Sequence, residues 1–495
     1  MKPTETPLAE RISKGLAAIT SANVVGVALK GLSILVLARF LLSPEEYGLL
    51  FLALSVVTFT QLFTDLGIAR SAARYVSEYQ ETDAGQVPHI IRTALTYNLA
   101  TIGVVGAVLL AFDDQIAGLV DEPSIAPFVA IGAVYVAARS LTVFSRRLFQ
   151  GLNRVTYSAL VTALTRGGEF VFVVGLAVLT GEVMGAFLGF VVSYVLAALV
   201  GGAVLYRRFY SRFPKAPAME PGLARRLFEY NLPLTTTKGA GQLLSKTDIV
   251  LLGYFWNPVV VGVYTLGLQI AEFIATPAAS LGFVISPTFG EHKANDDLGT
   301  AARIYQESFR HTLLLYVPGA VGLFVVADPA IRLIFGADYA NAIPVVKLLA
   351  LFVVLKAVNA ITNTALDYLG KARLRAYAKV AGAALNVVLN VALVPVFGAI
   401  GAAAATIATY GLLVGVNLAL VVRTLPLSVA RLGRTVVQVG LVAAVMGAVV
   451  VPTVPYVSGL VTLGAVVGLG VLVWGVLAVA SGLLEPDQVR AVLAS

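Results

Sequence analysis

Apolar stretches recur along the whole chain, and each is followed by a short polar or turn-forming segment. A stretch of ~20 apolar residues spans the hydrocarbon core of a bilayer as a helix. We count fourteen such stretches, separated by turn signals such as SPEE at 43–46 and WNP at 256–258. The predicted spans are 16–42, 47–67, 93–111, 124–145, 156–180, 183–206, 230–256, 259–285, 309–327, 342–367, 376–397, 399–422, 435–453 and 457–482.

The composition agrees with this pattern. Of 495 residues, 58% are hydrophobic and 13% are charged, and the mean hydropathy is +0.88. These values are typical of a polytopic membrane protein and exclude a soluble multidomain protein. The chain has no cysteine, and its three histidines are scattered, so we expect neither thiol chemistry nor a metal site. The sequence therefore predicts an all-α polytopic membrane protein.

Lys and Arg residues gather in alternate connecting segments, most densely in 207–229, whereas the intervening segments are acidic, as at Asp113 and Asp114. Cytoplasmic loops of membrane proteins carry the excess of Lys and Arg. We therefore expect a multi-pass protein of the cell membrane with both termini in the cytoplasm. The net charge of +8 reflects this topology and contact with anionic lipids rather than binding of nucleic acid.

Two halves of the chain share a weak internal repeat. At an offset of 214 residues, Pro44 and Gly48 match Pro258 and Gly262, and two further matches follow in the same order. Repeats of six helices with the same orientation are related by an axis along the membrane normal. We predict an N-lobe at 1–206, a cytoplasmic linker at 207–229, a C-lobe at 230–422, and two added helices with a cytoplasmic tail at 423–495.

Several charged residues fall inside the predicted spans. Charges at membrane depth are costly and normally face a bundle interior or an aqueous cavity. The intramembrane acids are too few to neutralise the cations, which predicts a net-cationic cavity for an anionic ligand such as a phosphate. The cations assigned to it are Lys30, Arg139, Lys238, Lys246 and Lys356.

Helix geometry refines two of these positions. Asn23, Lys30 and Ser33 fall within an arc of about 80° on the first span. Lys238, Gln242 and Ser245 form one stripe on the seventh span. We expect the uncharged members of both stripes to line the cavity.

The seventh span also carries Lys246 and Asp248, which lie about 160° apart on the helix and so cannot pair with each other. Asp248 and Glu272 are the acids available for binding a proton or Na⁺. Arg166 and Glu169, three residues apart, are expected to pair within their own helix.

Four stretches carry a family resemblance. They are LARFLLSPEEYGLL (37–50), FTDLGIARSAARY (63–75), SKTDIVLLGYFWNPVVVGVYTLGLQIAEF (245–273) and LNVVLNVALVPVFGAIGAAAAT (385–406). With them the chain resembles, over its whole length, the Wzx-type oligosaccharide flippases. These belong to the multidrug/oligosaccharidyl-lipid/polysaccharide exporter superfamily, which includes the MATE multidrug antiporters and the lipid II flippase MurJ.

The resemblance implies two six-helix lobes around a central cavity lined by the first, second, seventh and eighth helices, with the fourth and tenth helices contributing. It also implies transfer of a polyprenyl-(pyro)phosphate-linked oligosaccharide from the cytoplasmic to the outer leaflet by alternating access. The implied partners are this substrate, membrane lipids and polysaccharide assembly proteins.

Two other function classes remain open alternatives. A MATE-like ion-coupled drug antiporter exports mostly cations, whereas cations outnumber acids inside these spans. A membrane-embedded glycosyltransferase or ligase needs catalytic carboxylates in a large outer loop, and the outer loops here are short. The chain has no GxxxxGK[ST] phosphate loop, so we expect no ATP site and no other cofactor. An H⁺ or Na⁺ gradient, the membrane potential and substrate mass action remain open as driving forces.

Overall fold

The structure is a computed structural model that describes residues 25–229, 231–278 and 297–484. Its described part is helical and divides into two compact units, Met1–Gly262 and Val263–Ser495. The expected all-α architecture is confirmed. The compact units group the seventh predicted span with the first unit, and the predicted lobe boundaries at 206 and 230 stay a prediction.

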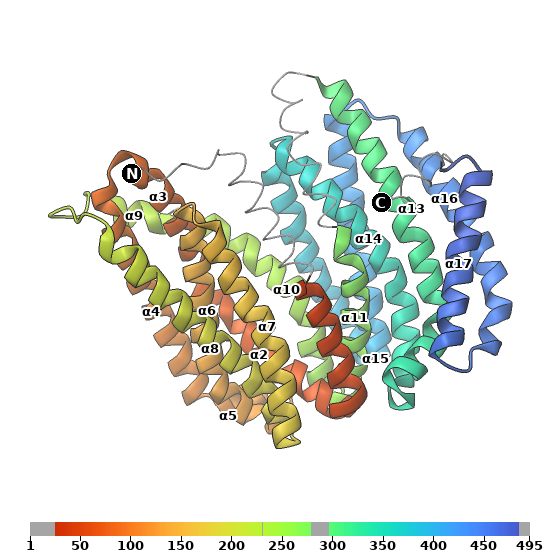
Figure 1. The fold of residues 1–495 in the computed structure, drawn as a ribbon, viewed down its shortest axis with the longest axis horizontal. Helices are drawn as coiled ribbons and strands as arrows, with labels where there is room; N and C mark the ends of the chain where they lie inside the picture. Colours follow the sequence, from red (N-terminus) through yellow and green to blue (C-terminus); the bar gives the residue numbers. More distant parts are fainter. Residues whose placement is uncertain (1–24, 230, 279–296, 485–495) are drawn as a thin grey trace, which may run out of the picture. The chain divides into compact units, whose positions relative to one another are not determined.

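The first unit is a bundle in which α2 packs against α4, α6 and α10, and α7 packs along α8 (Figure 1). Residues 25–36 form a helix that ends in a π-helical turn at Leu37–Leu41. The remaining helices are α2 (Pro44–Asp65), α3 (Ile68–Thr82), α4 (Val87–Ala111), α5 (Asp113–Gly118), α6 (Ala126–Gly151), α7 (Val155–Thr180), α8 (Val183–Arg208), α9 (Leu223–Glu229) and α10 (Asn231–Phe255).

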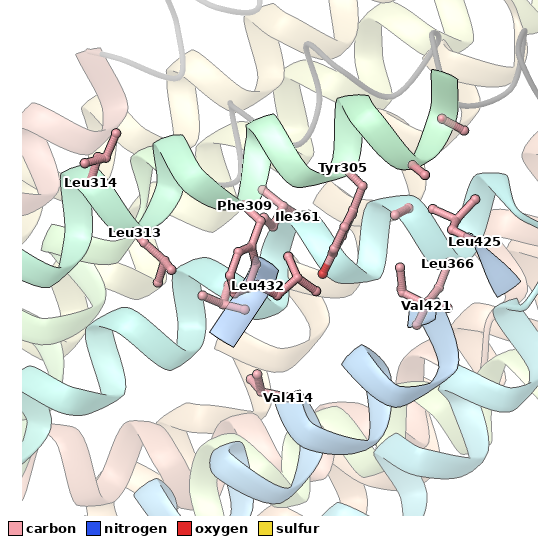
Figure 2. Close-up of a cluster of buried hydrophobic side chains, with 14 of the residues drawn as sticks. Tyr305, Phe309, Leu313, Leu314, Ile361, Leu366, Val414, Val421, Leu425 and Leu432 are labelled. Carbon is pink, nitrogen blue, oxygen red and sulfur yellow. The ribbon is translucent and has the colours of Figure 1, made fainter. Parts of the chain in front are cut away.

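The second unit buries an apolar core among α13, α14, α15 and α16. Figure 2 shows Tyr305 and Phe309 beside Ile361, with Val421 and Leu432 also in the cluster. The helices are α11 (Pro258–Ala275), which begins in the first unit, α13 (Leu298–Ala330), α14 (Ile343–Tyr368), α15 (Ala372–Thr424), α16 (Val429–Val450) and α17 (Leu460–Ala480).

Eleven segments of the described chain are long and apolar enough to cross a membrane. One of them, α15, is broken at Gly398, whose φ of 54° and ψ of −131° are not helical, so it supplies two spans. This break lies at the predicted boundary between the spans 376–397 and 399–422. The first predicted span is described in part, and α10 has the length to cross but is more polar. The fold is consistent with fourteen spans.

Two predicted turn signals start helices. Ser43 caps α2: its hydroxyl accepts from the Glu46 N–H at 3.3 Å, and the Glu46 carboxylate accepts from the Ser43 N–H at 2.8 Å. Such a capping box satisfies backbone donors that the first turn leaves unpaired. At the repeat-related start of α11, the Asn257 side chain accepts from the N–H of Val260 at 3.1 Å.

The repeated Pro-x-x-x-Gly motif packs against its own copy. A Cβ atom on Gly48 would lie 1.7 Å from the Pro258 carbonyl oxygen, and one on Gly262 would lie 2.0 Å from the Pro44 carbonyl oxygen. Both distances are far below van der Waals contact, so each glycine is required for the approach of the first turns of α2 and α11.

The predicted linker is docked on the first unit. The main chain of Ala216 bonds to Gly85 and to the His89 ring, at 3.1 and 2.9 Å, and the Ser71 hydroxyl donates to the Leu227 carbonyl at 2.8 Å. Through these contacts residues 216–227 follow α3 and the start of α4.

Candidate functional site

Arg139 is the centre of a polar cluster inside the first unit. Its Nη1 donates to the Thr58 hydroxyl on α2 and to the Tyr135 hydroxyl on α6, both at 3.2 Å. The guanidinium carbon lies 5.8 Å from the centre of the Tyr135 ring and 5.9 Å from that of Tyr194 on α8. Tyr135 precedes Arg139 by one helical turn, which places both on one face of α6. The four contacts use hydroxyls and ring faces, so none of them neutralises the arginine charge.

The nearest acidic group on the α2 side of this cluster is Asp65, an electrostatic neighbour of Arg139. Its carboxylate accepts a hydrogen bond from the Ser140 hydroxyl at 3.3 Å. Asn98, 3% exposed, donates to the same hydroxyl at 2.9 Å. Asp65, Ser140 and Asn98 thus form a polar chain from α2 through α6 to α4.

Glu169 on α7 is the second acidic neighbour. Its electrostatic neighbours are Tyr194, Arg166, Arg139 and Lys30. The pairing of Glu169 with Arg166 within α7 stays a prediction, and Lys30 and Arg139 belong to the predicted cationic set. The three cations Arg166, Arg139 and Lys30 thus outnumber the two acids Glu169 and Asp65 among these electrostatic neighbours.

The α10 residues approach the same cluster through Thr58. The Gln242 side chain donates to the main-chain carbonyl of Thr58 at 3.2 Å, so Thr58 binds Gln242 and Arg139 at once. The Ser245 hydroxyl is exposed and donates to Gly241 of its own helix at 2.6 Å. Two predicted site residues, Arg139 and Gln242, are thereby brought together.

Lys246 and Asp248 differ in burial. Asp248 is 2% exposed and accepts from the N–H of Ile249 at 2.9 Å, whereas Lys246 is half-buried. This difference agrees with their predicted placement on separate sides of α10.

In the second unit, two predicted residues form one ion pair. Lys356 on α14 binds the Glu272 carboxylate on α11 at 2.8 Å, and its ammonium lies 5.3 Å from the centre of the Phe352 ring. From the sequence, Lys356 was predicted to bind the substrate and Glu272 to bind a coupling ion. In the structure these two side chains bind each other. The roles themselves stay predictions.

For the remaining predicted site residues the structure gives burial or no side-chain position. Lys30 is exposed and Ser33 is half-buried on the helix 25–36. Asn23 lies outside the described residues, and the side chain of Lys238 lies outside the described side chains of α10.

The polar residues around Arg139 were not predicted from the sequence. The four-residue spacing between Tyr135 and Arg139 could have predicted their contact, because it places both on one face of α6. Thr58 and Tyr194 lie on other helices, and no sequence pattern links them to Arg139.

An apolar cavity of about 460 Å³ lies in the second unit among α11, α13, α16 and α17. The described residues that line it, among them Leu315, Met446 and Trp474, include no charged side chain. It has the wrong chemistry for an anionic group.

Comparison with known proteins gives two family matches. The protein-family model described as "Polysaccharide biosynthesis protein" matches residues 12–293, and the MatE family model matches residues 234–392. The chain is 24% identical to the "Probable low-salt glycan biosynthesis flippase Agl15" of Haloferax volcanii, over 78% of each chain. It is 23% identical to the "Lipopolysaccharide biosynthesis protein WzxC" of Escherichia coli, over 69% of this chain and 66% of that one.

The solved structures show a related fold. The "Lipid II flippase MurJ, inward closed conformation" aligns with a TM-score of 0.77 at 15% identity, over 93% of this chain and 98% of that chain. The expected MurJ-like architecture of a multi-pass membrane protein is confirmed.

Proposed function

Because the chain belongs to the polysaccharide biosynthesis protein family, whose model covers more than half of it, we propose that it is a flippase for lipid-linked oligosaccharides. It moves a polyprenyl-(pyro)phosphate-linked oligosaccharide from the cytoplasmic to the outer leaflet, for assembly of a surface polysaccharide or glycoprotein glycan. It acts as a transporter without catalysing a covalent step. The names of its relatives, a glycan biosynthesis flippase and a lipopolysaccharide biosynthesis protein, support this role.

The observation that carries the proposal is the environment of Arg139. Its guanidinium is inside the first unit and is held by two hydroxyls and two aromatic rings. An arginine binds phosphate oxygens through paired N–H groups, and its charge offsets the cost of moving a phosphate out of water. In this proposal Arg139 binds the (pyro)phosphate of the substrate. Lys30, Lys238 and Lys246 add positive electrostatic potential. Gln242 contacts the polar head group.

Transport proceeds by alternating access in a cell membrane, with both chain termini in the cytoplasm. The sugar and phosphate cross through the protein, while the polyprenyl tail stays in lipid. Asp248 and Glu272 are the proposed sites for coupling to H⁺ or Na⁺. Because Glu272 already binds Lys356, proton binding to this carboxylate would release the lysine for an anion.

The MatE match at residues 234–392 supports a second candidate, an ion-coupled drug antiporter. That activity requires acids to bind cationic drugs, whereas Glu169 has the three cations Arg166, Arg139 and Lys30 as electrostatic neighbours. The charge balance of the first unit favours an anionic substrate.

Reconstitution separates the two candidates. Proteoliposomes containing the purified protein are supplied with a fluorescent polyprenyl-pyrophosphate oligosaccharide or with a cationic dye. The flippase proposal predicts protein-dependent exchange of the lipid-linked sugar between leaflets and no dye transport above empty liposomes. Dye transport without movement of the lipid-linked sugar would contradict it.

A further inference from the structure

A second group of cations lies at the ends of α6, α7 and α8 that the sequence places on the cytoplasmic side. Three cations each lie beside an aromatic ring there, at the chain's turn from α6 to α7 and just after α8. We call this group the interfacial platform, and it consists of Arg154, Tyr157, Arg208, Phe209, Tyr210 and Lys215.

Each cation is oriented by its ring. The Arg154 guanidinium carbon lies 5.9 Å from the centre of Phe209, and the Lys215 ammonium lies 5.5 Å from that of Tyr210. Arg208 contacts Tyr157 through the hydroxyl, to which its Nη1 donates at 2.8 Å. Cation–π and hydroxyl contacts orient a cation without cancelling its charge.

The rings themselves are held by packing. Phe149, fully buried at the end of α6, lies 5.5 Å from Tyr157 and 5.9 Å from Phe209, measured between ring centres. Tyr157 and Phe209 meet edge to face at 5.4 Å. Because edge-to-face pairs fix ring orientation, the platform presents its cations in a defined arrangement.

The platform is exposed, and the two stretches of chain that form it carry no acidic residue. Arg154, Arg208 and Lys215 are all exposed. The sequence contains no Asp or Glu at 123–168 or at 183–219, the two stretches that supply the platform. Three cations therefore share one surface with no acid on the same stretches of chain.

The depth of the platform in the membrane follows from the helices that carry it. One to three turns further into α7 and α8, Leu160 and Leu164 are 44% and 37% exposed, and Leu196 and Leu199 are 41% and 63% exposed. Exposed leucines on spanning helices contact acyl chains. Aromatic and basic residues just beyond such a surface lie at the level of the lipid head groups.

We propose that the interfacial platform binds the phosphate groups of anionic phospholipids in the cytoplasmic leaflet. The surface is built for that partner, because it combines head-group depth, three oriented cations and rings that tolerate both water and lipid. Its residues are distinct from those around Arg139. The proposal rests on the membrane orientation given above and is independent of which substrate is transported.

The test compares two double variants of the full-length protein that each remove two positive charges from the same region. Arg154→Gln/Arg208→Gln alters the platform, and Arg207→Gln/Arg212→Gln removes exposed arginines outside it. Native mass spectrometry with added phosphatidylglycerol gives the dissociation constant of the bound lipid, with phosphatidylcholine as the zwitterionic comparison.

We expect each platform cation, held against a ring, to contribute a factor of about five by binding the lipid phosphate directly, whereas Arg207 and Arg212 act only through the screened surface potential. We therefore expect about 25-fold weaker phosphatidylglycerol binding in the platform variant, with the control variant within about threefold of the unmodified protein. Tyr157→Phe, which removes the hydroxyl that holds Arg208 and keeps the ring, should weaken binding by a smaller factor.

Three results would overturn the proposal. Equal losses in the two double variants would show that total charge, and not the platform, attracts the lipid. Unchanged binding in the platform variant would exclude the site. Preferential binding of a short-chain polyprenyl pyrophosphate over phosphatidylglycerol at the platform would assign it to the transported lipid instead.

Discussion

Arg139 donates a hydrogen bond of 3.2 Å to the Thr58 hydroxyl, and the carbonyl of the same threonine accepts one from Gln242. Thr58 therefore orients a cation on α6 and an amide on α10 at the same time. An arginine at membrane depth is costly, and neutral partners reduce this cost without removing the charge. This relationship leaves Arg139 able to attract an anionic group.

Replacing Thr58 by valine removes the hydroxyl and keeps the main-chain carbonyl that binds Gln242. The loss of one hydrogen bond of about 0.5–1.5 kcal/mol should weaken apparent affinity for the lipid-linked oligosaccharide about two- to tenfold. The measurement is the substrate dependence of translocation in proteoliposomes. Thr60→Val is the control, because the Thr60 hydroxyl bonds to Val57 of its own helix, and equal effects of both changes would contradict the assigned role.

The Lys356–Glu272 pair should couple the two residues energetically. Both side chains are about one-third exposed, at 31% and 36%, so we expect a coupling of about 1 kcal/mol rather than the larger value of a fully buried pair. A double-mutant cycle with Lys356→Gln and Glu272→Gln, read by thermal unfolding in detergent, measures it. Additive effects of the two single changes would show that the contact is not formed in the membrane protein.

The repeat glycines should not tolerate a side chain. A methyl group on Gly48 or Gly262 would overlap a backbone oxygen, so Gly48→Ala and Gly262→Ala should each destabilise the protein by about 1–3 kcal/mol or more. Thermal unfolding and the yield of monodisperse protein measure the effect.

Gly103 is the matched control, since a Cβ atom there meets nothing within 4 Å. An exposed Gly→Ala change inside a helix should stabilise by roughly 0.5–1 kcal/mol. Similar stabilities of Gly48→Ala and Gly103→Ala would contradict the close packing of the two motifs.

Docking of the segment 216–227 should depend on pH through Glu220. A hydrogen bond of 2.5 Å from the Tyr79 hydroxyl, aided by Arg226, lowers the pKa of the Glu220 carboxyl. A carboxyl with a lowered pKa contributes stability that is present above its usual pKa of about 4.3 and is lost as pH falls through the lowered value. Docking should therefore persist at neutral pH and weaken in acid below about pH 4.

Hydrogen exchange at the amides of Ala216 and Glu220, corrected for the intrinsic rate at each pH, follows this release. Glu220→Gln mimics the protonated carboxyl and should increase exchange at neutral pH. Exchange that is unchanged by this substitution would show that the carboxylate does not hold the segment.

Local patterns made the fold predictable. Spans are long and apolar, and the turn signal SPEE and the boundary between the eleventh and twelfth spans depend on adjacent residues. The structure breaks α15 at Gly398, at the predicted boundary, and the SPEE turn contains the cap of α2 at Ser43, which was not predicted. The docked position of 216–227 depends on distant partners on α3 and α4, and composition alone suggested a simple linker.

The candidate site was predictable in its charges and not in its contacts. Because a charge at membrane depth is costly, the sequence of each helix alone is enough to mark Arg139, Lys356 and Glu272 as candidate site residues. Their partners come from other helices: Thr58 and Tyr194 lie on α2 and α8, and Glu272 and Lys356 meet from α11 and α14. The spacing of residues along one helix shows which of them share a face, but it does not show which faces of different helices meet.

The most direct test of the central claim is translocation of a polyprenyl-pyrophosphate oligosaccharide by Arg139→Gln in proteoliposomes. Arg207→Gln, the loss of an exposed arginine, is the control. Hydrogen bonds to a charged group contribute about 1.5–3 kcal/mol, so the Arg139 variant should lose about 10- to 100-fold of its activity at normal membrane insertion, and the control should lose little. Full activity of Arg139→Gln would contradict the claim that this residue binds the anionic head group.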